Sequence, residues 1–109
     1  MDTKYQDLIE KILTDYASIP YSQGEIETRC IFDRQHNQFL LKNVGWNGKR
    51  RVDSCVVHLE IINGKIWIQE DNTEYGIATD LEEAGVPKSN IVLGFQPPKV
   101  RQYTEYAIT

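Results

Sequence analysis

The chain has 109 residues, a formal net charge of −4, 40% hydrophobic residues and 26% charged residues. This size and composition are typical of one globular domain, so we expect a single domain over residues 1–109. No apolar run has the length of a membrane span, nothing resembles a secretion signal, and the net negative charge disfavours a dedicated nucleic-acid-binding protein.

Residues 4–17 carry the pattern of an amphipathic helix, with apolar side chains at the i, i+3, i+4, i+7 spacing. Thr3 and Gln6 have the spacing of a capping box, in which each side chain bonds a backbone N–H of the first turn. Pro20 and Gly24 are expected to end the helix and lead into a loop. Its apolar stripe is expected to cover a sheet, although such a stripe can also meet a partner protein.

Residues 25–33 and 38–45 alternate apolar and polar side chains and are predicted as two strands joined by a polar turn. Pairing about that turn places Phe32 opposite Phe39. Since residues directly opposite each other share a face of the sheet, both aromatic rings should point toward the core.

The connection to the next strand contains Trp46, Asn47 and Gly48. A three-residue loop would place Gly48 in the left-handed conformation that such loops require. A two-residue turn at Asn47-Gly48 is the alternative, but it would set Phe39 opposite Val56 and remove Phe39 from the core face. We therefore expect the three-residue loop.

The strongest pattern lies in residues 51–71, which form a hairpin about Asn63-Gly64, a pair typical of a type I′ turn. This register predicts one apolar face and places Val57 opposite Glu70. The apolar face comprises Val57, Leu59, Ile61, Ile66 and Ile68. A slip of one residue would turn all of these side chains outward, so burial specifies the register.

The last third of the chain predicts a second helix over residues 75–84, preceded by cap-type residues at 71–73 and followed by Gly85. A short apolar strand over 91–93 and a short helix over 98–103 complete the pattern. The predicted fold class is therefore α+β. It comprises an N-terminal helix, a four-stranded antiparallel meander, a second helix, a short apolar strand and a short C-terminal helix.

The second face of the meander also carries apolar side chains, and one helix stripe cannot cover both faces. These are Ile31, Leu40, Val44, Val56, Ile62 and Trp67. Contiguous apolar area of this extent usually marks an interaction site. We expect a partner interface containing Val56, His58, Ile62 and Trp67, which would support homodimerisation or docking of a companion protein. In the alternative interpretation, the second helix and the C-terminal segment cover this face. Because Ile77, Ala78 and Leu81 are few and small, we expect partial cover only.

Two further clusters contain residue types that can carry chemistry. Lys49, Arg50 and Arg51 form the densest basic run, and Trp46 beside them could stack on a base; this run either contacts nucleic acid weakly or is simply solvated. Glu70, Asp71 and Glu74 form an acidic cluster that either caps a helix or gathers a divalent ion for a hydrolase or nuclease.

No catalytic constellation surrounds His36 or His58, so we expect no enzyme activity and no cofactor. Cys30 and Cys55 are not in a metal-ligand spacing and are expected to be buried thiols in a reducing compartment. Together with the lack of a secretion signal, they predict a cytoplasmic protein.

Several stretches together resemble a known family: IPYSQGEIET, VGWNGKRRV, GKIWIQED and GVPKSNIVLGFQPP. This combination is similar to the XisI family of cyanobacterial proteins, the fdxN element excision controlling factors. The resemblance implies an accessory, regulatory protein of DNA rearrangement during heterocyst differentiation, acting through protein partners. It also implies a companion protein called XisH and a separate recombinase, and it supplies no catalytic residues.

Overall fold

The computed structural model describes residues 3–19 and 25–109. Pro20 and Gly24, which were predicted to end the first helix, lie outside the described residues. The elements in chain order are α1 (Lys4–Ala17), β1 (Glu25–Asp33), β2 (Gln38–Asn47), β3 (Arg50–Ile62), β4 (Lys65–Asp71), α2 (Ile77–Glu83), the 3₁₀ turn η1 (Lys88–Asn90), β5 (Ile91–Leu93) and α3 (Pro98–Arg101).

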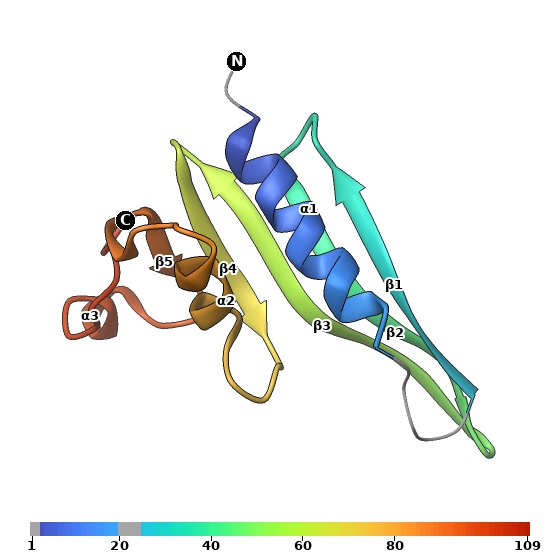
Figure 1. Cartoon of the computed structure of the whole chain (residues 1–109). Helices are drawn as coiled ribbons and strands as arrows, with labels where there is room; N and C mark the ends of the chain where they lie inside the picture. Colours follow the sequence, from blue (N-terminus) through green and yellow to red (C-terminus); the bar gives the residue numbers. More distant parts are fainter. Residues whose placement is uncertain (1–2, 20–24) are drawn as a thin grey trace.

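The strands form one sheet in the order β1-β2-β3-β4-β5. β1 to β4 are an antiparallel meander, as predicted, and β5 pairs with β4 in parallel. The α+β class is confirmed, but the sheet is a mixed sheet of five strands rather than a meander of four. Helices α1 and α2 both lie on one side of this sheet (Figure 1). None of the described helices is long and apolar enough to cross a membrane.

The core lies between the sheet and these two helices. Its members come from every layer: Ile9, Leu13, Phe39, Leu41, Val57, Leu59, Ile66, Ile68, Ile77, Ala78, Leu81, Val86 and Ile91. The predicted pairing of Phe32 with Phe39 is confirmed, and the ring centroids lie 6.0 Å apart. We call the sheet surface opposite α1 and α2 the open face.

The turn between β2 and β3 differs from the prediction. Asn47 pairs with Arg50, so the turn has two residues, Gly48 and Lys49, instead of a loop at 46–48. Phe39 nevertheless stays on the core face, because the register shifts by one residue further along the strands. Leu41 pairs with Val57 while Lys42 pairs with Cys55, which leaves Val56 as the extra residue of a β-bulge.

The central hairpin also contains an irregularity that the sequence pattern did not predict. Asn63 and Gly64 have φ values of 51° and 77°, and Leu59 pairs with Ile68, all as expected. Beyond that pair the register shifts, so Val57 lies opposite Asp71 and not opposite Glu70. The shift turns Asp71 toward the helices.

The N-terminus of α1 lies where it was predicted, but its capping hydrogen bonds differ from the prediction. The helix begins after Thr3, but the Thr3 side chain makes no capping hydrogen bond, so the capping box does not form. The side chain of Gln6 instead donates to the carbonyl oxygen of Arg34 at 3.2 Å and to Asn37 Oδ1 at 2.8 Å. Gln6 therefore ties α1 to the β1–β2 turn.

Helix α2 is shorter than predicted, because Gly76 is not helical (φ 85°, ψ 126°) and the helix begins at Ile77. The Ile77 N–H donates to Asp71 Oδ2 at 2.8 Å, while Thr73 donates twice to Asp71 Oδ1. At the other end Gly85 takes the expected positive φ, and the Val86 N–H bonds the Leu81 carbonyl in a Schellman motif. The C-terminal helix α3 ends at 101, two residues earlier than predicted.

Replacing Asp71 should destabilise the protein through the start of α2. Asp71→Ala leaves three donors of the 73–77 segment without their acceptor, and we expect a loss of about 1–2 kcal/mol in the free energy of unfolding. Urea denaturation measures the change. The matched control is Glu74→Ala, an exposed acid three residues later, which should change stability by less than about 0.5 kcal/mol. Equal effects of the two substitutions would contradict this capping role.

Candidate functional site

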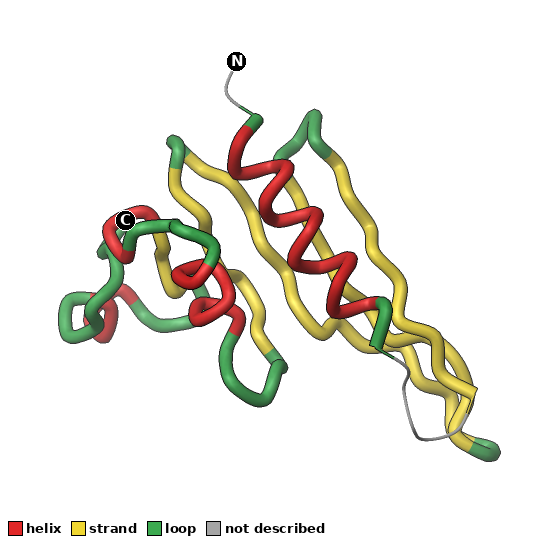
Figure 2. The backbone as a smooth tube through the Cα atoms, in the orientation of Figure 1, coloured by secondary structure: helices red, strands yellow, loops and turns green. Residues whose placement is uncertain are grey.

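The open face has a covered part and an uncovered part. The chain after β5 is mostly loop and lies at the β5 side of the sheet (Figure 2). The Ala107 N–H bonds the Ile91 carbonyl, and Val92, which shares the open face with its neighbour Trp67, is completely buried. The C-terminal segment therefore closes the face at β4 and β5.

Trp67 belongs to this covered part. Its ring lies 5.0 Å from the guanidinium carbon of Arg101, an arrangement that favours cation–π attraction. Arg101 is held by the backbone carbonyl oxygens of Leu93, Gly94 and Gln96. Trp67 is consequently half-buried. The C-terminal segment was expected to cover part of this face, whereas α2 lies on the opposite side.

The uncovered part extends over β1, β2 and β3. Ile31 is 48% exposed, and Leu40, Val44 and Ile62 are half-buried beside it. His58 lies among them, with its Nε2 2.7 Å from the side-chain oxygen of Gln38. None of the helices in the described ranges packs over this region.

Val56 does not belong to the open face, and its predicted position was wrong. The β-bulge described above interrupts the alternation of side chains at this residue. Val56 packs against the core cluster and lines a cavity near Tyr16, on the helix side of the sheet.

The basic run lies at the tip of the β2–β3 hairpin, well beyond the end of α1 (Figure 1). The Arg51 guanidinium carbon lies 5.2 Å from the Trp46 ring, which is 48% exposed. Lys49 and Arg50 are exposed and form no ion pair with any residue in the described ranges. The structure thus brings the four predicted residues together on an exposed tip.

The acidic cluster does not form a metal site in the described part of the chain. No three His, Cys, Asp or Glu side chains at positions 3–19 and 25–109 are arranged to hold an ion. Glu70 accepts a hydrogen bond from Asn72, and Asp71 caps α2. The helix-capping interpretation is the one that the geometry supports.

Both cysteines are half-buried rather than fully buried. The pKa of Cys30 is raised by burial, and Cys30 Sγ lies 3.6 Å from the Leu13 carbonyl oxygen. The pKa of Cys55 is raised by burial and by the nearby Glu70 carboxylate. A raised pKa keeps a thiol protonated and so disfavours reactivity as a thiolate.

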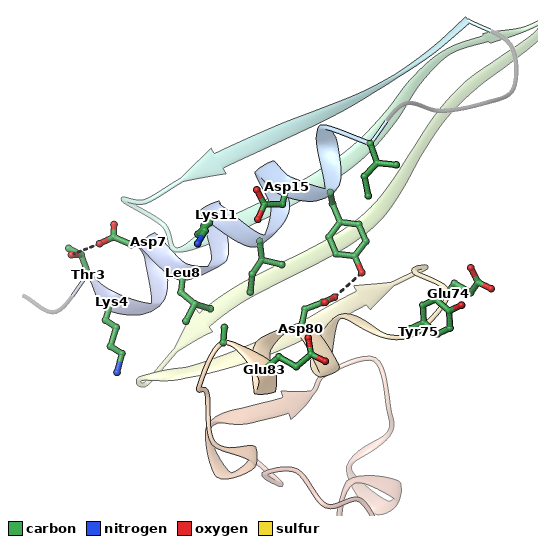
Figure 3. A pocket seen from close by; sticks show the side chains of 14 residues that line it. Thr3, Lys4, Asp7, Leu8, Lys11, Asp15, Glu74, Tyr75, Asp80 and Glu83 are labelled. Carbon is green, nitrogen blue, oxygen red and sulfur yellow. Dashed lines mark hydrogen bonds between the residues drawn. The ribbon is translucent and has the colours of Figure 1, made fainter.

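A groove of about 1280 Å³ between α1 and α2 was not predicted from the sequence (Figure 3). One helical face of α1 lines it with Leu8, Ile12 and Tyr16, and the loop before α2 adds Tyr75. The signal in the sequence was the second apolar row of α1, which lies beside the buried row of Ile9 and Leu13. The sequence pattern assigned the whole apolar stripe of α1 to covering the sheet, and Tyr75 to the second helix.

Tyr16 joins the two walls of the groove. Its hydroxyl donates to Asp80 Oδ2 at 2.8 Å (Figure 3). Burial first, and then the hydrogen bond to the Asp80 carboxylate, raise the pKa of Tyr16 to about 12. The phenol therefore stays protonated and keeps donating up to strongly alkaline pH.

The fold is that of an α+β protein. Two helices lie on one side of a five-stranded mixed sheet, and the second face of the sheet is partly open. A protein-family model with the description "XisI protein" matches residues 1–108 of this chain. The chain belongs to the XisI family, and the resemblance inferred from its motifs is confirmed.

Two solved structures from Anabaena variabilis ATCC 29413 share this fold. One is a XisI-like protein with 44% sequence identity and a TM-score of 0.91, covering 98% of each chain. The other is the fdxN element excision controlling factor XisI, with 40% identity and a TM-score of 0.79, covering 98% of this chain and 97% of that chain. No curated protein matches the sequence.

Removing the Tyr16 hydroxyl should change how stability depends on pH. Burial and the hydrogen bond to Asp80 raise the folded pKa of Tyr16 to about 12 from an ordinary 10.0. The protonated phenol therefore contributes its full stability below pH 10, and this contribution is lost as pH rises through 12. Tyr16→Phe should cost about 1 kcal/mol at neutral pH and flatten the alkaline loss. Urea unfolding at several pH values tests this, with the exposed Tyr103→Phe as control. An unchanged alkaline profile in Tyr16→Phe would contradict the assignment.

Proposed function

We propose that this protein is an accessory, controlling factor in the excision of a DNA element, and that it acts by binding a protein partner. Membership of the XisI family supports the first part, as does the full-length similarity to the fdxN element excision controlling factor XisI of Anabaena variabilis. The process in this proposal is the DNA rearrangement of heterocyst differentiation that the family resemblance implies.

The uncovered part of the open face is the observation that favours binding of a partner. It exposes Ile31 and leaves Leu40, Val44 and Ile62 half-buried across three strands, while both core-forming helices lie on the other side. A contiguous surface of apolar side chains with a polar surround is typical of protein interfaces. A companion of the XisH type is the first partner to test, and a second copy of the chain is the other occupant.

Trp67 is a weaker probe of this interface than the sequence pattern suggested. The ring already packs beneath Arg101, so truncating Trp67 would disturb the C-terminal segment as well as the face. Ile31 is a cleaner probe because its side chain is exposed on the edge strand β1 and takes no part in the core cluster.

Ile31→Glu should abolish binding of the companion while leaving the fold intact. A charge buried within an apolar contact remains desolvated and unpaired, which typically weakens binding by about 2 kcal/mol or more, or at least about 30-fold. Co-expression with the XisH-type companion, followed by co-purification and light scattering, measures both the complex and any dimer.

Tyr103→Glu is the matched control, since Tyr103 is 84% exposed and follows α3 in the C-terminal segment, away from β1, β2 and β3. It should leave the complex intact. If both variants bind the companion, or if neither does, the open face is not the specific docking surface.

Direct contact with nucleic acid at the hairpin tip is a second candidate function. The observation in its favour is the stacked pair of Arg51 and Trp46 beside the exposed Lys49 and Arg50, at a hairpin tip well beyond the end of α1. Since the chain carries a net charge of −4, such contact should be weak and sensitive to salt.

Replacing Arg50 and Arg51 together by Ala should weaken binding to duplex DNA at low salt. If each arginine neutralises one phosphate, the slope of log affinity against log salt should fall by about 2. Fluorescence anisotropy over a salt series measures the slope. The control is Lys99→Ala, an exposed cation on α3. Unchanged affinity and slope in the double variant would exclude the tip as a DNA contact.

A further inference from the structure

The groove between α1 and α2 lies on the opposite side of the sheet from the open face. The proposed function therefore does not account for it. It is lined along most of α1, from Thr3 to Ile19, and by Asp80, Glu83 and Ala84 of the α2 region. Figure 3 shows the lining side chains on the two helices and on the loop before α2, with Asp80 of α2 facing α1.

The floor and rim of the groove expose apolar surface. Tyr75 is 82% exposed at one end and Ile19 is 63% exposed, while Leu8 and Ile12 are half-buried along the floor. Large apolar side chains that remain open to solvent along one groove are the feature that peptide-binding grooves share. An apolar side chain of a bound segment would find its contacts here.

The charges around this apolar surface are mostly negative. The lining contains five acids, Asp7, Asp15, Glu74, Asp80 and Glu83, against two lysines, Lys4 and Lys11. Asp7 is neutralised by Arg34 at 2.8 Å, and Asp80 accepts from Tyr16. No described residue provides a hydrogen-bond or ion-pair partner to the carboxylates of Asp15, Glu74 and Glu83. Three acids are thus available to an incoming cation.

The length of the groove sets the size of its occupant. Helix α1 has 14 residues, which corresponds to roughly 21 Å at 1.5 Å per residue. A segment lying along it would need about four helical turns. A helix satisfies its own backbone hydrogen bonds, and the groove is lined by side chains of helices rather than by a free strand edge, so a helix fits better than an extended strand.

We propose that this groove binds an amphipathic, basic helical segment of another protein. The apolar stripe of that segment would pack on Leu8, Ile12, Ile19 and Tyr75, and its Lys or Arg side chains would pair with Asp15, Glu74 and Glu83. A phosphate backbone is repelled by these acids. A second copy is poorly matched as well, because this chain is itself acidic.

The test uses a synthetic peptide of about 15 residues, with Leu at the i, i+3, i+4, i+7 spacing and Lys or Arg on the flanks of that stripe. Fluorescence anisotropy should show binding to the full chain that weakens as salt rises. A second peptide with Glu in place of every Lys and Arg should bind at least about tenfold more weakly.

The double variant Tyr75→Ala, Glu83→Lys should weaken binding of the basic peptide by at least about tenfold. Both positions are exposed, so the fold should be retained. The matched control is Tyr103→Ala, Glu25→Lys, which removes an 84% exposed tyrosine and reverses an exposed acid, both outside the groove. Its affinity should stay within about twofold of the unsubstituted protein.

Several results would overturn this inference. They are an absence of binding at about millimolar peptide, equal affinity for the acidic peptide, or equal loss in both double variants. Self-association of the unsubstituted chain that disappears in Tyr75→Ala would assign the groove to a second copy instead. Because the peptide experiment needs no companion protein, its failure leaves the open-face proposal to be judged separately by Ile31→Glu.

Discussion

Burial of Val57, Leu59, Ile66 and Ile68 beneath α1 and α2 is the constraint on which the rest of the structure depends. All four side chains are completely buried, and each contributes roughly 1.5–3 kcal/mol relative to an exposed position. A slip of one residue in the central hairpin would expose the whole set. The type I′ turn at Asn63-Gly64 and this burial therefore select the same register independently.

Two β-bulges change the register of the sheet near the helices. One turns Val56 toward the helix side, and the other brings Asp71 opposite Val57. Asp71 then reaches the first N–H of α2, which sets where α2 begins and hence how far it lies from α1. Tyr16 and Asp80 join the two helices across that distance. The irregularity that orients Asp71 thus fixes where α2, one wall of the groove, begins.

These relationships explain how far the sequence could predict the molecule. The alternation of side chains and the Asn-Gly turn identified the hairpins, and helical spacing identified α1, because each signal is local. A bulge leaves no such local signal, so the positions of Val56 and Asp71 could not be predicted. The hairpin tip was correctly grouped because its residues are neighbours in sequence. The groove could not be predicted, since its walls are Tyr16 and Asp80, 64 residues apart.

The single sheet separates two surfaces with different character. The open face presents mixed and apolar side chains around Ile31, whereas the groove on the other side is apolar with an acidic rim. Occupants of the two sides would not compete for the same residues. Each would nevertheless stabilise the same small core, because binding to the folded state alone raises stability by RT ln(1 + [L]/Kd). A chain with one thin core can in this way gain stability from its partners without any change in its fold.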